Sequence, residues 1–430
     1  MSNFTRVLFA SSEKSSYWLS AVGLATGSFG AQSRGMGILS TGKIILNFHD
    51  SSGQQAGNAR LSVDGTMDWI QRKGTGAGSN GPSMDTAIDS NDNFLVVNGA
   101  SAGGYLKHNS LGVPLAGFKG GSTGIYSASA IYIDSSDNTY VGAWKAGAPY
   151  NPVVAKINSA GTLQWIRHIG DASNQNSNLN SVFTDSSANV YLGGQTGVNP
   201  NTAIFGYKDA QIAKYNTSGT LQWIYNYGAS GIQMNEPMGS ADSSGNTYWS
   251  GNANTPTFKL NSSGVVQWSK AYTTGSITMQ GSKIGPDGNL YLYGDVGYNR
   301  FLACWDTDGN ELWALTFGHT SASYNNYDLA GGTQNWIGFD NDGSIYVQFN
   351  FLITGNQSWN ACIKLPNDGT LTGTYDGWVI QSVSETIASV SLSRGSQTWN
   401  SGTNTTWTSY TLPTYTDMSN TWTNTVDKLG

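Results

Sequence analysis

One unit of roughly 45–55 residues recurs along the chain, and this repeat limits the possible folds more than any other feature. Each copy carries an Asp-x-x-x-Asn turn, a Tyr and a Gly, then a basic residue, a second turn ending in Gly, and a Trp. The clearest copy runs from Asp134 to Trp165. Because a repeat array of this period can form one domain, a length of 430 residues does not require several domains.

Each copy predicts four short strands. Its two turn signals are rich in Asp, Asn and Gly, which support tight turns, and the runs between them, such as Val153–Ile157, suit strands. The composition agrees, because only 11% of residues are charged and Tyr and Trp number 22 and 15. Two hairpins per unit match a propeller blade. We therefore predict an all-β fold, a seven-bladed β-propeller, with copies marked by Gly42, Asp89, Asp134, Asp185, Asp242, Asp287 and Asp340.

A Trp recurs four residues after the Gly of the second turn. Ala116 and Gly373 are the exceptions to this register. Such aromatic rings could stack on sugars, but we interpret them as structural residues that pack blade against blade, because large aromatic side chains dominate burial. The residues are Trp69, Trp165, Trp223, Trp268 and Trp313.

A basic residue stands five positions before the same Gly, with Cys304 as the exception. A ring of cations could bind an anionic polymer. The interpretation that we favour is structural: each aliphatic stem packs on its strand, and each charged head meets an Asp of the blade or a carbonyl. The residues are Arg60, Lys107, Lys156, Lys214, Lys259 and Lys364.

The N-terminal stretch contains a last strand without the first three. Trp18–Gly23 has the spacing of Trp165–Gly170, and the seventh copy lacks its Trp at Gly373. We therefore predict that residues 17–23 complete the seventh blade, which would hide edges that an open ring exposes. Trp378 is the competing candidate for that strand.

The repeat ends near residue 373, which predicts a propeller over residues 1–373 and a non-repeating, β-rich segment over 374–430. This segment is rich in Thr, Ser and Asn, with spaced aromatic residues. It could be a β-segment used for assembly, a lid across the propeller, or a surface extension without a role. The possible interaction residues are Trp399, Trp407 and Trp422.

No recognisable constellation points to catalysis, a cofactor or a metal. The four His residues are scattered, and Cys304 and Cys362 fit free buried thiols better than a disulfide framework. The sequence has no basic block for nucleic acid and no apolar run long enough for membrane insertion. Residues 17–25 make a poor signal peptide, because Glu13 and several apolar residues precede them.

The repeat, Asp-x-x-Gly-Asn-x-Tyr-x-x-Gly followed by Lys-x-Asn-x-x-Gly-x-x-x-Trp, resembles the SBBP-type β-propeller repeat and, more distantly, the tryptophan-docked repeat of quinoprotein dehydrogenases. The resemblance covers about residues 38–373 and implies the fold, while no quinone or metal ligand set carries over.

The Asn, Thr and Gly-rich composition looks like that of bacteriophage tail and fibre proteins. The sequence thus favours a non-enzymatic structural or interaction protein of a virion, in the tail or host-recognition apparatus. Its partners would be other virion proteins in several copies, or a host surface glycan. The alternatives are a secreted bacterial adhesin or lectin-like propeller, and a polysaccharide-degrading enzyme.

Overall fold

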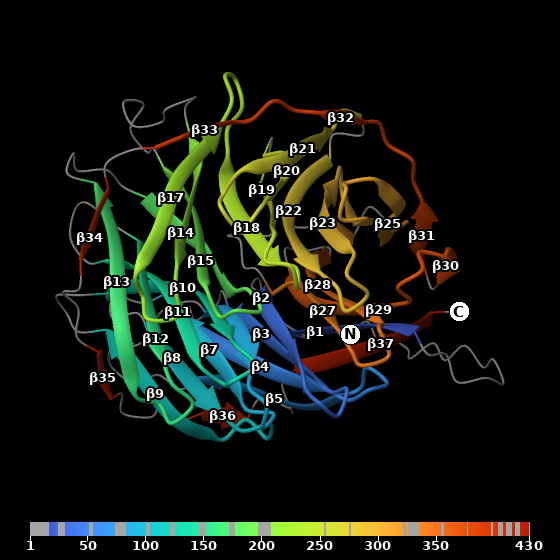
Figure 1. Cartoon of the computed structure of the whole chain (residues 1–430). Helices are drawn as coiled ribbons and strands as arrows, with labels where there is room; N and C mark the ends of the chain where they lie inside the picture. The colour runs from blue at the N-terminus through green and yellow to red at the C-terminus, as the bar shows by residue number, and fades with distance from the viewer. Residues whose placement is uncertain are drawn as a thin grey trace.

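Seven antiparallel sheets make up the protein. The computed structural model describes residues 17–24, 31–50, 55–73, 83–99, 104–120, 125–145, 152–171, 177–196, 208–252, 255–274, 277–320, 324–325, 335–353, 357–375, 377–396, 399–402, 407–409, 415–417 and 422–429. These residues contain no helix, and their sheets are arranged as the blades of a β-propeller (Figure 1). The all-β, seven-bladed fold predicted from the repeat is confirmed.

Each blade carries four strands of the ring, numbered here from the inside outwards. Blade 1 has β2 (Ala31–Ile38), β3 (Ile44–Asp50), β4 (Gln55–Leu61) and β5 (Met67–Lys73), and blade 2 has β6 (Ser83–Ile88), β7 (Phe94–Asn98), β8 (Gly104–His108) and β9 (Pro114–Gly120). Blade 3 has β10 (Ile125–Ile133), β11 (Thr139–Lys145), β12 (Pro152–Ile157) and β13 (Leu163–Asp171), and blade 4 has β14 (Ser177–Thr184), β15 (Val190–Thr196), β16 (Asp209–Tyr215) and β17 (Leu221–Gly228). Blade 5 has β18 (Asn235–Ala241), β19 (Thr247–Asn252), β20 (Thr257–Leu260) and β21 (Val266–Tyr272), and blade 6 has β22 (Ile277–Ile284), β23 (Leu290–Val296), β24 (Asn299–Trp305) and β25 (Glu311–His319).

Blade 7 joins the two ends of the ring. The chain supplies its inner strands late, as β26 (Tyr324–Asn325), β27 (Ile337–Phe339), β28 (Ile345–Ile353) and β29 (Gln357–Leu365), whereas its next strand is the N-terminal β1 (Tyr17–Leu24). Trp18 of β1 lies opposite Lys364, the same register in which Trp165 lies opposite Lys156 in blade 3. The predicted closure by residues 17–23 is therefore confirmed, and Trp378 belongs to another blade.

The C-terminal segment adds a further strand to the outer edge of every blade. Its strands are β30 (Gly373–Tyr375), β31 (Trp378–Ser382), β32 (Ile387–Ser389), β33 (Ser393–Gly395), β34 (Trp399–Gly402), β35 (Trp407–Ser409), β36 (Tyr415–Asp417) and β37 (Trp422–Leu429). From β31 to β37 they pair in turn with β25, β21, β17, β13, β9, β5 and β1, so the segment visits the blades in reverse order.

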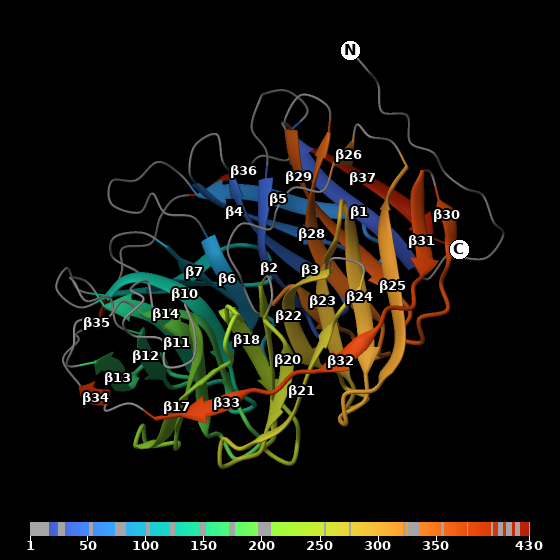
Figure 2. The same ribbon diagram turned by 90° about the horizontal axis from the view of Figure 1, so that it is seen from above.

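Figure 2 shows this segment, in orange and red, running along the periphery of the ring. Because its strands extend the sheets of the blades, they lie on the outer edges and not across the propeller. This placement as a cover of the blade edges was not among the three alternatives drawn from the sequence. The boundary at residue 373 between ring and segment stays a prediction.

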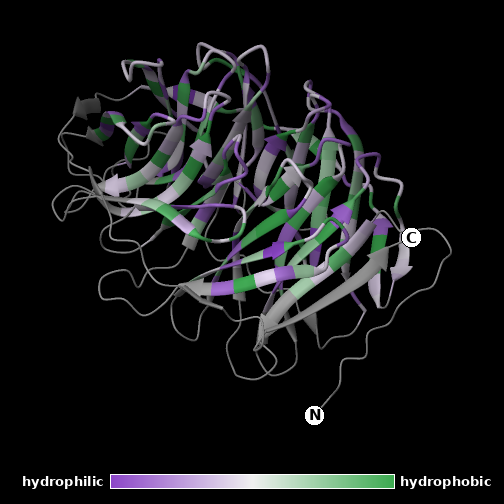
Figure 3. Cartoon of the chain, turned by 90° about the horizontal axis from the view of Figure 1, so that it is seen from below, coloured by the Kyte–Doolittle hydropathy of each residue, from purple (hydrophilic) through white to green (hydrophobic). Residues whose placement is uncertain are grey.

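The hydrophobic core lies between neighbouring sheets. Apolar and polar residues alternate along many strands (Figure 3), as expected where each strand has two faces to pack. The largest fully buried side chains include Trp18, Trp249 and Trp305. Trp18 also packs edge-on against Tyr346 of blade 7, with ring centroids 6.0 Å apart.

Loss of the N-terminal strand should destabilise the whole ring. We expect Trp18→Ala to lower the free energy of unfolding by about 3–5 kcal/mol, because the side chain is 1% exposed and leaves a large cavity. Urea denaturation measures the change. Tyr298→Ala, at a residue 73% exposed, is the control and should change stability by less than about 0.5 kcal/mol. An unchanged melting temperature after deletion of residues 1–25 would contradict the closure.

Removing the outer strands should make the protein self-associate. A chain that ends at residue 396 lacks β34–β37, which leaves β13, β9, β5 and β1 with unpaired backbone groups. Such edges act as templates for pairing with another chain. Light scattering after size-exclusion chromatography should show concentration-dependent association of the truncated chain but not of the full-length protein. A truncated chain that stays monomeric and melts at the full-length temperature would argue against this role.

Candidate functional site

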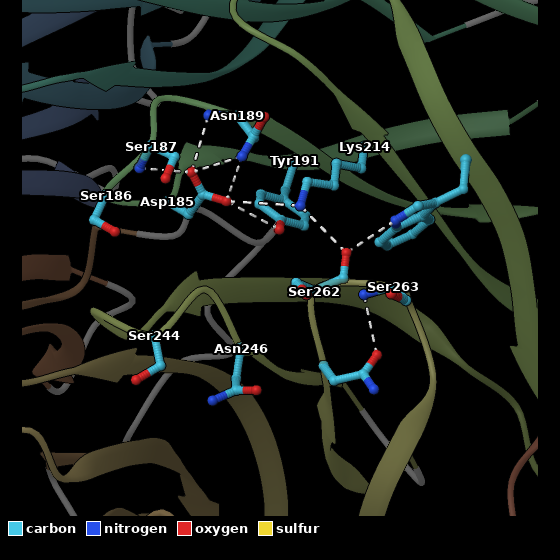
Figure 4. A network of polar contacts seen from close by, with 12 residues as sticks. Asp185, Ser186, Ser187, Asn189, Tyr191, Lys214, Ser244, Asn246, Ser262 and Ser263 are labelled. Carbon is cyan, nitrogen blue, oxygen red and sulfur yellow. Dashed lines mark hydrogen bonds and ion pairs between the residues drawn. The ribbon is translucent and has the colours of Figure 1, made fainter.

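In five of the seven blades the first turn is held by a buried or half-buried carboxylate. In blade 4, Asp185 Oδ1 accepts hydrogen bonds from the backbone N–H groups of Ser187 and Asn189, at 3.0 and 2.9 Å (Figure 4). Its Oδ2 accepts from Asn189 Nδ2 at 2.9 Å and from the hydroxyl of Tyr191 at 3.2 Å. Asp89, Asp134, Asp242 and Asp340 accept the corresponding bonds from their turns. These repeated Asp residues therefore fix turns.

The ring of basic residues is engaged within the protein. Lys214 Nζ lies 3.8 Å from Asp185 Oδ2, donates to the Ser262 carbonyl of the next blade at 3.2 Å, and sits 5.1 Å from the ring centroid of Tyr191. Both the carboxylate and the carbonyl proposed as partners from the sequence are thus present.

The other five basic residues have comparable partners. Arg60 donates to Asp68 at 2.8 Å and to the Ser110 carbonyl at 2.6 Å; Lys107 pairs with Asp89 at 2.7 Å; Lys156 reaches the Thr217 carbonyl at 3.5 Å; Lys259 reaches the Thr307 carbonyl at 3.0 Å; and Lys364 pairs with Asp340 at 3.1 Å. Since each head has an internal partner, this ring is a poor candidate for binding a polymeric anion.

The repeated Trp residues join a blade to the next in every blade except blade 2, which has Ala116 at this position. Trp165 Nε1 donates to the Thr217 carbonyl at 3.1 Å, and its ring covers Gly219 so closely that a Cβ there would lie 2.8 Å away. Gly219 also has a φ of +76°, so glycine is required on both counts.

The same arrangement recurs around the ring. Trp18, Trp223 and Trp268 donate to the carbonyls of Val63, Ser262 and Thr307, while Trp69 and Trp313 cover Gly112 and Gly369.

The Trp residues of the C-terminal segment lie on the outer edges. Trp399 pairs with Asp171, Trp407 with Gly120 and Trp422 with Leu24 through their backbones, and the structure describes only the backbone of these three residues. Their role as interaction residues stays a prediction.

Blade 2 departs from the repeat, and a cavity of about 290 Å³ lies between it and blade 3. Ala116 stands where six blades have Trp, and Leu95 stands where five have Tyr. The cavity is lined by Asp89, Asn93, Leu95, Tyr105, Lys107, Leu115, Ala116, Asp137, Thr139, Asn158, Ser159, Ala160 and Gly161. We take this cavity as the candidate functional site.

Charged and amide groups line one part of the cavity. Burial raises the pKa of the Asp89 carboxyl, but hydrogen bonds from Lys107 and Asn93 and the lysine charge outweigh it, so the pKa lies below its ordinary value. Asp89 and Lys107 therefore form an ion pair at neutral pH. On the blade 3 side, Asp137 accepts hydrogen bonds from the N–H and hydroxyl of Ser90, at 2.9 and 2.5 Å. These charged and amide groups line the cavity together with the apolar Leu95, Leu115 and Ala116.

A second polar cluster joins the inner strands of blades 2 and 6 to Asn335, which precedes β27 of blade 7. Asn335 Nδ2 donates to Asp85 Oδ1 at 3.0 Å, and its Oδ1 accepts from Lys283 Nζ at 3.4 Å. Burial raises the pKa of the Asp85 carboxyl to about 7, against hydrogen bonds and the Lys283 charge that lower it. Asp85 is fully buried, so this cluster ties blades together and offers no described opening to a substrate.

The described residues were compared with the requirements of a metal site and of a membrane-spanning helix. Among them, no three His, Cys, Asp or Glu side chains gather closely enough to hold a metal ion. Cys304 and Cys362 are buried free thiols, as predicted. Within the described ranges there is no helix that could cross a membrane.

Comparisons with known proteins add no family. No protein-family model matches the sequence, and no curated protein matches it. The crystal structure of a protein of unknown function from Bacteroides caccae is 11% identical, with a TM-score of 0.43, and the match covers 70% of this chain and 94% of that one. The polysaccharide lyase Uly1 is 8% identical, with a TM-score of 0.46, and the match covers 75% of this chain and 88% of that one. BBS1N, solved in complex with ARL6DN, is 13% identical, with a TM-score of 0.47, and the match covers 81% of this chain and 97% of that one. Such identities and TM-scores carry no inference about activity.

The Asp–Lys pairs of the turns predict that the stability of the fold decreases in acid. Burial raises the pKa of Asp340, but hydrogen bonds from Lys364 and Tyr346 and the lysine charge outweigh it, so the pKa lies below its ordinary value. A carboxyl with a depressed folded-state pKa stabilises the fold above its unfolded pKa of about 3.9, and this contribution is lost as the pH falls through the folded pKa. The melting temperature should therefore fall between about pH 4 and pH 2, and less steeply in Asp340→Asn.

Lys364→Met is the matched control for this pair. It should flatten the acid limb by a similar amount, and the double variant should add little to either single change. An Asp340→Asn variant whose acid limb parallels that of the wild type would show that the pair does not contribute.

Proposed function

We propose that this chain is a non-enzymatic structural or interaction protein of a bacteriophage virion, in the tail or host-recognition apparatus. The observation that carries the proposal is the cover of the blade edges. Each of the seven blades has its outer strand paired with a strand of the chain's own C-terminal segment. Because an open edge invites pairing with another chain, this cover suits a protein present in many copies within one particle.

The use of the repeated polar residues also supports a scaffold. The Asp and basic residues that recur in the blades hold turns and neighbouring blades, as Asp185 and Lys214 do. Their recurrence therefore has a structural cause, and no catalytic pair emerges from it. A ring whose repeated Asp and basic residues are engaged within the protein can present its non-repeating surfaces to partners, which would be other virion proteins.

A lectin-like, glycan-binding propeller of a secreted adhesin is the second candidate. The cavity between blades 2 and 3 favours it, since Asp89, Asn93, Asp137 and Asn158 bring carboxylate and amide groups to one site. Such groups form hydrogen bonds with hydroxyls of the kind that sugars carry. In this case the ligand would be a host surface glycan.

Particle proteomics tests the virion role. Lysates of cells that encode the chain would be fractionated on a density gradient, and peptides would be quantified by mass spectrometry. The chain should co-sediment with the other particle proteins at a constant copy ratio. Recovery only in the soluble or secreted fraction would overturn the proposal, and a fraction from cells without particles is the control.

A further inference from the structure

We propose that the cavity between blades 2 and 3 is a binding slot for a tryptophan side chain carried by a partner polypeptide. The inference concerns this slot alone and does not depend on which particle or surface carries the chain. It rests on what the same position holds elsewhere in the ring, on the size of the cavity, and on an exposed apolar hairpin that supplies one of the lining residues.

The other blades show what fits between a fourth strand and the next blade. In blade 3 the indole of Trp165 lies over Gly219 and donates to the carbonyl of Thr217, two residues before this glycine. At the interface of blades 2 and 3 the corresponding residues are Ala116 of blade 2 and Gly161 and Ser159 of blade 3, and all three line the cavity. The slot therefore keeps its glycine floor and its acceptor carbonyl but lacks its own indole.

The ion pair leaves the acceptor available. Lys214 and Lys259 share their carbonyls with the neighbouring Trp, at 3.2 and 3.0 Å. Lys107 instead pairs with Asp89 at 2.7 Å. Within the described residues, neither an indole N–H nor a lysine ammonium donates to the Ser159 carbonyl, so an entering indole would find its usual acceptor.

The cavity volume suits a bicyclic ring. A cavity of about 150 Å³ is enough for benzene, whereas pockets for drug-sized ligands begin near about 300 Å³. At about 290 Å³ the slot lies between these sizes, as expected for one aromatic side chain with a few neighbouring atoms.

An exposed apolar hairpin explains why the occupant should belong to a polypeptide and not to a free small molecule. Leu115 lines the cavity at the start of β9 and is 47% exposed, and Leu111 and Val113, in the turn that precedes β9, are 63% and 52% exposed. In blade 3 the same positions are Ala160, Thr162 and Gln164. These three large apolar side chains of one hairpin, of which Leu115 lines the slot, are a surface that a partner segment could cover while it inserts its Trp.

Calorimetric titration with N-acetyl-L-tryptophanamide tests the slot. The wild-type protein should bind one equivalent. Ala116→Trp restores the indole of the other blades, so binding should fall at least tenfold while the melting temperature rises. Ala116→Phe, which fills the slot with a smaller ring, serves if the first variant does not fold.

Trp165→Ala is the matched positive control, because it opens an equivalent slot between blades 3 and 4. The probe should then bind with a second equivalent and raise the melting temperature of this variant. Absence of saturable binding to the wild type, unchanged binding in Ala116→Trp, or binding of methyl glucoside in place of the probe would overturn the proposal. Binding of N-acetyl-L-tyrosinamide with equal affinity would also contradict a slot shaped for indole.

Discussion

A ring of blades depends on the non-covalent contact that joins its first blade to its last. Every other blade is linked to its neighbours by the chain itself. Here that contact is the pairing of β1 with β29, reinforced by Trp18, which is buried at the junction and donates to the Val63 carbonyl of blade 1. The contact repeats the geometry found between consecutive blades, so the closure is made with the same interactions as the rest of the ring. No special clasp is needed when the last blade is shared between the two ends of the chain.

The C-terminal segment adds a second set of strand pairings around the closed ring. The chain travels around the ring once as blades, then returns in the opposite direction as one short strand per blade, and β37 ends beside β1. Several of these strands have only three residues, which is too short for independent stability. Each gains its backbone hydrogen bonds from the blade that it covers, and in return it removes an open edge. Opening any single blade would therefore also strip part of the segment, which should make unfolding more cooperative.

The sequence predicted the ring well and the segment poorly, for a physical reason. Trp18 and Gly23 could be placed because they keep the spacing of the repeat, which reflects the same packing in every blade. The outer strands, such as Ser393–Gly395, carry no such spacing, since they make backbone pairs without a shared side-chain position. Ala116 was visible as an exception, but the cavity beside it needs residues from two blades, among them Asp137 and Gly161, and no local pattern reports their meeting.

The repeat also indicates where selection for function can act. A position that contacts the next blade in the same way around the ring cannot change without weakening an interface, as the buried indole of Trp165 shows. Blade 2 differs from the repeat at the Trp and Tyr positions, where Ala116 and Leu95 both line the cavity, and its exposed Leu115 lines the same cavity. A partner side chain that fills the slot beside Ala116 would supply the packing that the indole of a repeated Trp provides at the other interfaces.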